Sequence, residues 1–380
     1  MLHGLGRLAA SCVFFCTALA GAADGVAPGR ILVGQSITLQ GGRNDYGVAV
    51  LAGVQAYLET VNAAGGVHGR QVALKTLDDD NRPAQAEANA RQLVQDDKVF
   101  LLFGAVEGGP STAMMKVAAE SKVPFFGPMA GSPTLRRPHQ PYVFPVRAEH
   151  RDEFRALLDY ARRTGVQRVA FLRSDSETGL QHLENVKAIC RELGLELVAD
   201  LPFAGNASDA HLQALAARIG AAKAQVVINH GSPGVYEQLI RQARAQGVKA
   251  SFSGVNSGSA QLAQRLGDLA HAMVFAQVVP SPWERKSAIT REYQDNFARR
   301  RPGQAFTYGS LEGYLTAKAL VQGLQLAGPN PTRESFVRGL YTAGRIDLGD
   351  GLRASYAPGD HTGLTLVDLA IVTRQGKFRH

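Results

Sequence analysis

A regular alternation of short β-branched runs with longer stretches of helical periodicity constrains the fold most, and it extends from residue 30 to about residue 275. This alternation is typical of a parallel sheet covered by helices on both faces. The expected strands are 31–37, 72–77, 99–103, 169–172, 197–201, 226–228 and 273–276. The expected helices are 48–63, 84–95, 113–121, 180–193, 211–219 and 236–246. The sequence therefore predicts an α/β fold.

The length of the chain and two changes of rhythm predict two lobes. A chain of 380 residues exceeds the size at which a single core keeps growing. A second series of βα units begins after 142–146, and after 278–280 the chain becomes mostly helical, with expected helices at 289–300 and 311–327. The tail, 351–378, has the pattern of antiparallel strands at 352–356 and 365–372. We expect two doubly wound parallel-sheet lobes, 23–146 with 280–347 and 147–279 with 348–380, joined by three crossovers.

Residues 1–22 have the pattern of a secretory signal peptide. Arg7 is the only charged residue among the first 23, and an apolar or small run from 8 to 20 precedes two A-x-A cleavage signatures. The run is shorter than the roughly 20 residues that span a bilayer. Cys12 and Cys16 would leave with this segment, and only Cys190 would remain. Lipidation at Cys12 is a weaker alternative, because the preceding residues lack the usual leucine. We expect export to the periplasm.

The composition argues against a nucleic-acid partner. The formal net charge is +8, but the basic residues occur in twos and threes, such as 136–137 and 299–301, without interleaved aromatic residues. This distribution is typical of a solvated face.

Local motifs for cofactors, metals and nucleophiles are missing from the sequence. There is no G-x-G-x-x-G, no P-loop, no C-x-x-C, no H-E-x-x-H and no G-x-S-x-G. The run 78–81 is interpreted as helix caps and solvated loop, because the spacing of a calcium loop is absent. We expect no cofactor, no metal and no enzymatic activity. A hydrolase with Ser232 or Ser257 remains a minor alternative, because triads assemble from distant residues.

The loops at the carboxyl ends of the strands are the expected binding positions, because ligands of open parallel sheets bind there. The candidate residues in these loops are Gln40, Tyr46, Glu107, Gly108, Gly109, Ala130, Gly131 and Ser132. Pro110 suits a first helical turn, so the amides of Gly108 and Gly109 would favour an anion. For Tyr46 and for the Gly108 loop, ordinary packing and an ordinary tight turn are the alternatives.

Four segments resemble one known family. The strand with Tyr46-Gly47, the N-A-x-G-G-x-x-G-R turn at 62–70, the acidic pair at 78–79 and the I-R-Q-A-R-x-x-G helix end at 240–247 resemble the leucine/isoleucine/valine-binding protein family of type I periplasmic receptors. The likeness runs in order from about residue 30 to the end of the chain.

The resemblance implies two lobes with three crossovers that close around a ligand. It implies that the hydroxyl side chains which hold a carboxylate in amino-acid-binding members fall on Gly108 and Gly131, and that Asn256 stands in place of the acidic ammonium ligand. The other implied pocket positions are His150, Thr178 and Ser232. Because a buried ammonium needs an anion, Asn256 argues against a simple branched-chain amino acid. An organic acid, amide or aromatic ligand is equally consistent with the sequence.

Together these features predict a monomeric receptor that binds a small molecule and delivers it to the permease of an ABC importer. A periplasmic sensor of the same fold that acts on a signalling partner is an alternative. An exported enzyme is a weaker one.

Overall fold

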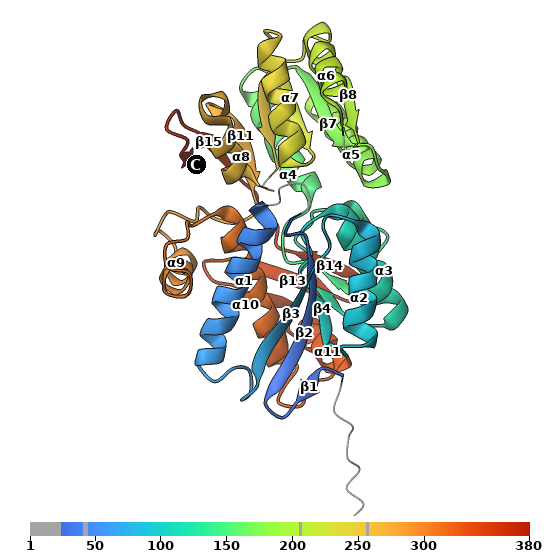
Figure 1. Ribbon diagram of the computed structural model, residues 1–380, viewed down its shortest axis with the longest axis vertical. Coiled ribbons are helices and arrows are strands. Elements are labelled where there is room, and N and C mark those ends of the chain that lie inside the picture. Colours follow the sequence, from blue (N-terminus) through green and yellow to red (C-terminus); the bar gives the residue numbers. More distant parts are fainter. Residues whose placement is uncertain (1–23, 41–44, 205–206, 256–257) are drawn as a thin grey trace, which may run out of the picture.

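The computed structural model describes residues 24–40, 45–204, 207–255 and 258–380. The chain forms two lobes that follow one another along the longest axis, each built on its own sheet with helices on both faces (Figure 1). This arrangement confirms the predicted class, two doubly wound α/β lobes.

The first lobe has a six-stranded sheet in which β2 pairs in parallel with both β3 and β4. Its strands are β1 (Val26–Ala27), β2 (Arg30–Ile37), β3 (Gln71–Asp78), β4 (Leu101–Phe103), β5 (Phe125–Phe126) and β6 (Val143–Phe144). Helices α1 and α10 cover one face and α2 and α3 the other (Figure 1). The helices of this lobe are α1 (Asp45–Ala63), α2 (Pro83–Gln95), α3 (Gly108–Ser121), α9 (Ala288–Arg300), α10 (Tyr308–Leu326) and α11 (Arg333–Ala343).

Two glycines allow α1 and α10 to pack at backbone contact. A Cβ atom on Gly53 would lie 1.9 Å from the carbonyl oxygen of Ser310, and one on Gly313 would lie 2.1 Å from that of Val50. Any larger residue at either position would force the helices apart. The close contact fixes the helical layer next to the hinge.

The second lobe has a seven-stranded sheet in the order β16-β15-β11-β10-β9-β7-β8, in which β11 to β8 run parallel and β15 and β16 antiparallel. Its strands are β7 (Arg168–Ser174), β8 (Glu196–Phe203), β9 (Val226–His230), β10 (Ser251–Gly254), β11 (Val274–Gln277), β15 (Asp368–Val372) and β16 (Phe378–Arg379). Its helices are α4 (His150–Arg163), α5 (Glu177–Leu193), α6 (Asp209–Ala221), α7 (Pro233–Ala245) and α8 (Ser259–Leu266).

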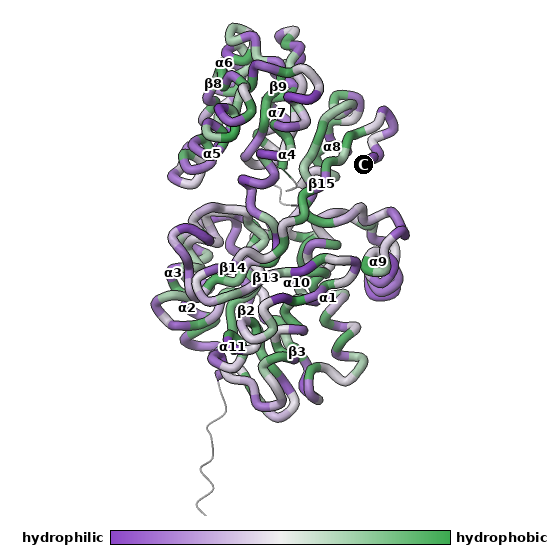
Figure 2. The backbone as a smooth tube through the Cα atoms, turned by 180° about the vertical axis from the view of Figure 1, so that it is seen from behind, coloured by the Kyte–Doolittle hydropathy of each residue, from purple (hydrophilic) through white to green (hydrophobic). Residues whose placement is uncertain are grey.

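The expected strands and helices correspond to elements of the structure, with shifted ends. The strand expected at 99–103 is shorter, since β4 comprises only Leu101–Phe103. The sequence analysis missed β10, whose residues Ser-Phe-Ser-Gly carry little β-branched signal, and the helices α4, α8 and α11, which were not among the expected elements. Each sheet is buried between helices, and Figure 2 shows hydrophobic residues concentrated inside the two lobes. Within the described part of the chain, no helix has the length and apolar character needed to cross a bilayer.

The tail corrects the expected lobe boundary. Strands β12 (Arg345–Asp347), β13 (Arg353–Ala357) and β14 (Asp360–Gly363) form a separate antiparallel sheet that packs against α11 and β6 of the first lobe. The Tyr356 hydroxyl donates to the Pro145 carbonyl oxygen at 2.9 Å. After α11, the chain returns to the second lobe only between β14 and β15. The assignment of 348–380 to the second lobe was therefore wrong up to about residue 363, because buried alternate residues of β13 complete the core of the first lobe.

Candidate ligand-binding site

A cavity of about 600 Å³ lies between the lobes. Its wall comes from α2 and α3 of the first lobe and from α4, α5, α7 and β9 of the second. The volume lies within the range of about 300–1,000 Å³ that is typical of small-molecule sites. The cavity is therefore large enough for a small organic solute.

Five helices begin at the cavity wall, one of them α4 at His150, and the other four follow parallel strands of their own lobes. Pro83, Gly108, Glu177 and Pro233 are the first residues of α2, α3, α5 and α7, and all four line the cavity. Each of these four helices follows a parallel strand of its lobe, so the strand order places the four starts at facing sheet edges. Helix starts carry partial positive charge and amides without partners inside the helix. The site therefore favours a negatively charged group of the ligand.

Hydroxyl groups cap two of these helices. The Ser176 Oγ atom accepts from the Gly179 amide at 3.1 Å, and the Ser232 Oγ atom accepts from the Val235 amide at 3.2 Å. A serine hydroxyl that accepts in this way still has its own proton to donate. Both serines line the cavity.

Two glycines in the loops of the first lobe have different surroundings. A Cβ atom on Gly108 would meet nothing closer than the Thr178 Cγ2 atom at 3.8 Å, whereas one on Gly131 would lie 2.6–2.8 Å from atoms of His150. The imidazole of His150 thus occupies the space where a side chain at position 131 would point. Position 108 can accept a larger residue, and position 131 cannot.

Three histidines lie together at the second-lobe side of the cavity. Their ring centroids are 3.9 Å apart for His182 and His230, 4.7 Å for His150 and His230, and 5.3 Å for His150 and His182. His150 and His230 line the cavity, and His182 is buried beneath them. Burial lowers the pKa of all three imidazoles, that of His230 to about 4. All three are therefore neutral at pH 7.

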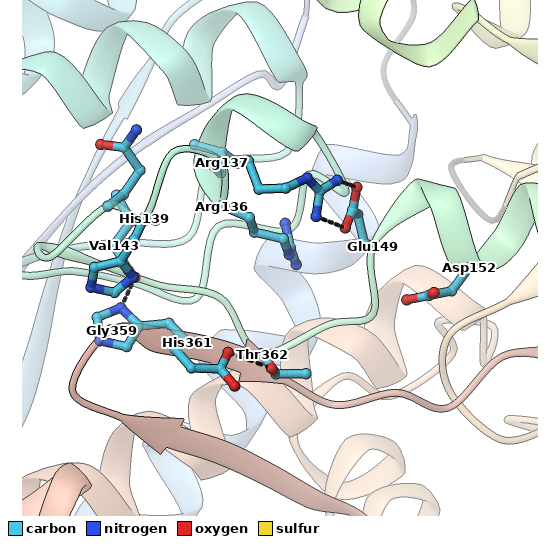
Figure 3. A pocket seen from close by; sticks show the side chains of 12 residues that line it. Arg136, Arg137, His139, Val143, Glu149, Asp152, Gly359, His361 and Thr362 are labelled. Atoms are coloured by element: carbon cyan, nitrogen blue, oxygen red, sulfur yellow. Dashed lines mark hydrogen bonds and ion pairs between the residues drawn. The ribbon is translucent and has the colours of Figure 1, made fainter. Parts of the chain in front are cut away.

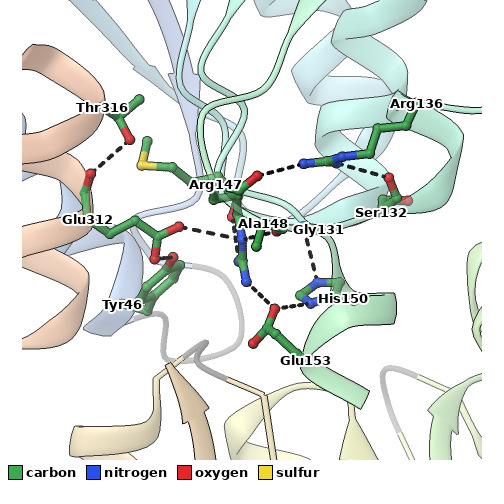
Figure 4. Close-up of polar contacts among 11 residues, drawn as sticks. Tyr46, Gly131, Ser132, Arg136, Arg147, Ala148, His150, Glu153, Glu312 and Thr316 are labelled. Atoms are coloured by element: carbon green, nitrogen blue, oxygen red, sulfur yellow. Dashed lines mark hydrogen bonds and ion pairs between the residues drawn. The ribbon is translucent and has the colours of Figure 1, made fainter. Parts of the chain in front are cut away.

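A buried ion-pair network joins the lobes at the first crossover (Figure 4). Arg147 forms an ion pair with Glu153 of α4, and its Nε atom lies 3.7 Å from the Glu312 Oε1 atom of α10. The Tyr46 hydroxyl donates to Glu312 at 2.6 Å. Burial opposes the charge of Arg147, but the carboxylates of Glu153 and Glu312 keep the pKa of the guanidinium above its usual value. The network connects α1, α4 and α10 across the hinge.

A second cavity, of about 350 Å³, lies beside this crossover (Figure 3). Arg137 and Glu149 on its wall form a two-point ion pair. The Arg136 guanidinium donates to the Arg147 carbonyl oxygen at 2.9 Å. These groups hold the crossover in place, so the cavity is part of the hinge.

Six of the residues predicted for the site line the cavity between the lobes: Glu107, Gly108, Gly109, His150, Thr178 and Ser232. They come from four helices that the sequence alone could not place side by side. Their contact with a ligand stays a prediction.

Five predicted residues have other positions. Gln40 is exposed, and Tyr46 belongs to the hinge network, which agrees with its packing alternative. The loop of Ala130, Gly131 and Ser132 is buried behind the wall. The Gly131 amide donates to His150, and Ser132 contacts Thr134, whose side chain reaches the cavity.

The remaining candidate, Asn256, lies outside the described residues.

Sequence reasoning missed His182 and His230. The prediction of no metal depended on local motifs, and the structure brings together histidines from three separate elements. The spacing of such residues along the chain carries no signal, because the sheet topology alone makes them neighbours.

The comparison with known families gives one match over nearly the whole chain. The family described as periplasmic binding protein matches residues 30–377. The chain belongs to this family. A Leu/Ile/Val-binding protein homolog 1 of Brucella abortus (strain 2308) is 27% identical over 314 residues, with 80% of each chain covered.

Two solved structures show the same fold at low identity. One is an ABC transporter solute-binding protein of R. palustris in complex with benzoate, with a TM-score of 0.79, 20% identity, and 92% and 95% of the two chains covered. The other is the branched-chain amino acid transporter substrate binding protein LivJ of Streptococcus pneumoniae in complex with isoleucine, with a TM-score of 0.79, 18% identity, and 92% and 98% covered. The two structures show the same two-lobed fold, and the Brucella relative makes the chain similar in sequence to Leu/Ile/Val-binding proteins.

Proposed function

We propose that the protein is the periplasmic solute-binding receptor of an ABC importer and that it binds a small carboxylate-containing solute between its lobes without altering it. Amino-acid-like, organic-acid and aromatic carboxylates are the candidate ligands, and a neutral amide is the less favoured one. Residues 1–22 would direct the export of the chain and would be removed.

The observation that carries the proposal is one cavity whose wall comes from both lobes and receives five helix starts. A ligand that contacts both lobes binds the closed arrangement more tightly than the open one, so it shifts the population toward closure. A permease can recognise the closed form. The crossovers between the lobes supply the hinge that this motion needs.

The charges in the cavity narrow the ligand class. The helix starts favour a carboxylate, while Glu107, Glu177 and Lys116 on the wall offer partners to further charged groups. A ligand ammonium would therefore find a carboxylate in the described part of the wall, although position 256 is a neutral asparagine. Relatives of the same fold that bind isoleucine and benzoate support both amino acids and aromatic acids as candidates.

A thermal-shift panel of amino acids, aromatic acids, aliphatic acids and amides tests the proposal. A true ligand at a hundredfold excess over its dissociation constant should stabilise the folded state by about 2.7 kcal/mol. Gly108→Trp should abolish this shift, because the new side chain would project toward Thr178 across the cavity. Gly29→Trp is the matched control, because Gly29 is exposed and has no neighbour within 4 Å of the added Cβ atom.

Recovery of the unchanged ligand by mass spectrometry, and compaction by small-angle scattering when it binds, should accompany the shift. Conversion of the ligand to a product, or an equal shift in Gly108→Trp, would contradict a receptor with its site in this cavity.

A further inference from the structure

The three histidines at the cavity wall have the composition and the mutual distances of a metal site. His150 begins α4, His182 lies within α5 and His230 ends β9. One ring nitrogen from each can be chosen so that the three atoms all lie within 4.8 Å of one another. Neutral imidazole nitrogen is a preferred ligand of Zn²⁺, Cu²⁺ and Ni²⁺.

The hydrogen bonds of these rings are incomplete. Both ring nitrogens of His182 are buried and have no hydrogen-bond partner among the described residues, although the residue is 0% exposed. The Nδ1 atom of His230 is also buried and has no hydrogen-bond partner among the described residues. A buried polar atom without a partner is destabilising, and a bound ion is one of the ordinary explanations for it.

The third histidine is oriented as metal-binding histidines are. The Nδ1 atom of His150 donates to the Glu153 carboxylate at 2.8 Å, which leaves a lone pair on its Nε2 atom. That Nε2 atom accepts only a long contact of 3.2 Å from the Gly131 amide. A carboxylate behind the ring fixes the orientation of a metal-binding histidine and raises its basicity.

The surrounding charges are mixed. The guanidinium groups of Arg147 and Arg136 near His150 oppose a bound cation, whereas the Glu153 carboxylate in contact with this ring favours one.

We propose that His150, His182 and His230 bind one divalent transition-metal ion, with Zn²⁺, Ni²⁺ and Cu²⁺ as the fitting class, and that an open coordination position faces the cavity between the lobes. Metal–nitrogen bonds of about 2.0–2.1 Å require the rings to converge by small rotations. Three protein ligands with an open position are the arrangement of metal sites that bind a further molecule. This metal would complete its coordination with the carboxylate of the solute, a step that rests on the proposed function.

Titration of tag-free, chelator-treated protein with Zn²⁺ by calorimetry, and with Co²⁺ by visible absorption, tests the site. We expect one ion per chain and the intense d–d bands of tetrahedral Co²⁺. His182→Asn and His230→Asn should each weaken Zn²⁺ binding by about 100-fold or more, and Glu153→Gln by about 10–100-fold. His271→Asn, which removes an exposed histidine outside the cluster, should bind as the unchanged protein does.

His182 is fully buried, so His182→Asn can fail to fold. His230 is only half-buried, so His230→Asn provides a second test if that happens. Circular dichroism verifies that each variant is folded. The proposal is overturned if the unchanged protein binds no stoichiometric ion, or if folded His230→Asn binds Zn²⁺ as tightly as it does. The solute panel run in the presence of chelator is a separate readout. A positive panel without metal binding would refute the metal site and leave the receptor function intact.

Discussion

Replacement of Arg147 by methionine tests the network that joins the lobes. Arg147 is 2% exposed, Glu312 is also 2% exposed, and Glu153 is fully buried. The substitution keeps an unbranched apolar side chain up to about the position of Nε and removes the guanidinium, so two buried carboxylates lose the cation that neutralises them. Hydrogen bonds from Tyr46 and His150 would remain.

The expected loss is large. Removal of one partner from a buried ion pair typically costs 3–5 kcal/mol, because the remaining charge stays in a low-dielectric environment. We therefore expect Arg147→Met to lower the free energy of unfolding by about 3–5 kcal/mol. Arg155→Met is the control, because Arg155 pairs with Glu192 at the surface and both side chains are well exposed. Such exposed pairs contribute about 0–1 kcal/mol.

Urea denaturation followed by circular dichroism measures both variants. Adding Glu153→Gln and Glu312→Gln to Arg147→Met should restore part of the loss, since neutral amides no longer need a cation. The reasoning fails if Arg147→Met loses no more stability than Arg155→Met, or if the triple variant is less stable than the single one.

Two further predictions concern the cavity wall and the response to pH. Gly131→Ser should lower the melting temperature and weaken ligand binding, because its Cβ atom would lie 2.6–2.8 Å from His150, whereas Gly108→Ser should leave the melting temperature almost unchanged. Overpacking of this kind costs about 1–3 kcal/mol, and equal melting curves for the two variants would contradict the steric argument. Burial lowers the pKa of His361 to about 4, so the unfolded chain takes up its proton first as the pH falls. The stabilising effect of neutral His361 is complete above about pH 6.5 and is lost as the pH falls to about 4, by about 3 kcal/mol at most. His361→Phe should flatten the decline of stability in this window, the exposed His271→Phe should not, and an unchanged decline in His361→Phe would refute the assignment.

The sequence by itself determined the local elements and the class of fold. The β-branched runs around Val33 and Val227 and the periodic helices between strands are short-range patterns, and they predict buried parallel strands wherever they occur. Strand β10 was missed because Ser-Phe-Ser-Gly carries a weak local signal. Helix α4 was missed although Phe154, Leu157, Leu158 and Ala161 recur with clear helical spacing. Loop position also predicted Gly108 and Gly109 at the site, since the rule for strand ends depends only on the order of elements.

Only the tertiary structure decided which of these loops meet. Tyr46 and Gln40 follow a strand end as Gly108 does, but Tyr46 turns toward Glu312 in the hinge, and Gln40 remains exposed. His182 and His230 are 48 positions apart and belong to different elements, so their contact depends on the strand order β9-β7 and on the packing of α5. The hairpin of β13 and β14 joined the first lobe because Tyr356 fits its core. Local sequence patterns determine helices and strands. Contacts between distant residues depend on how whole sheets and helices pack, and no short window of the sequence predicts that packing.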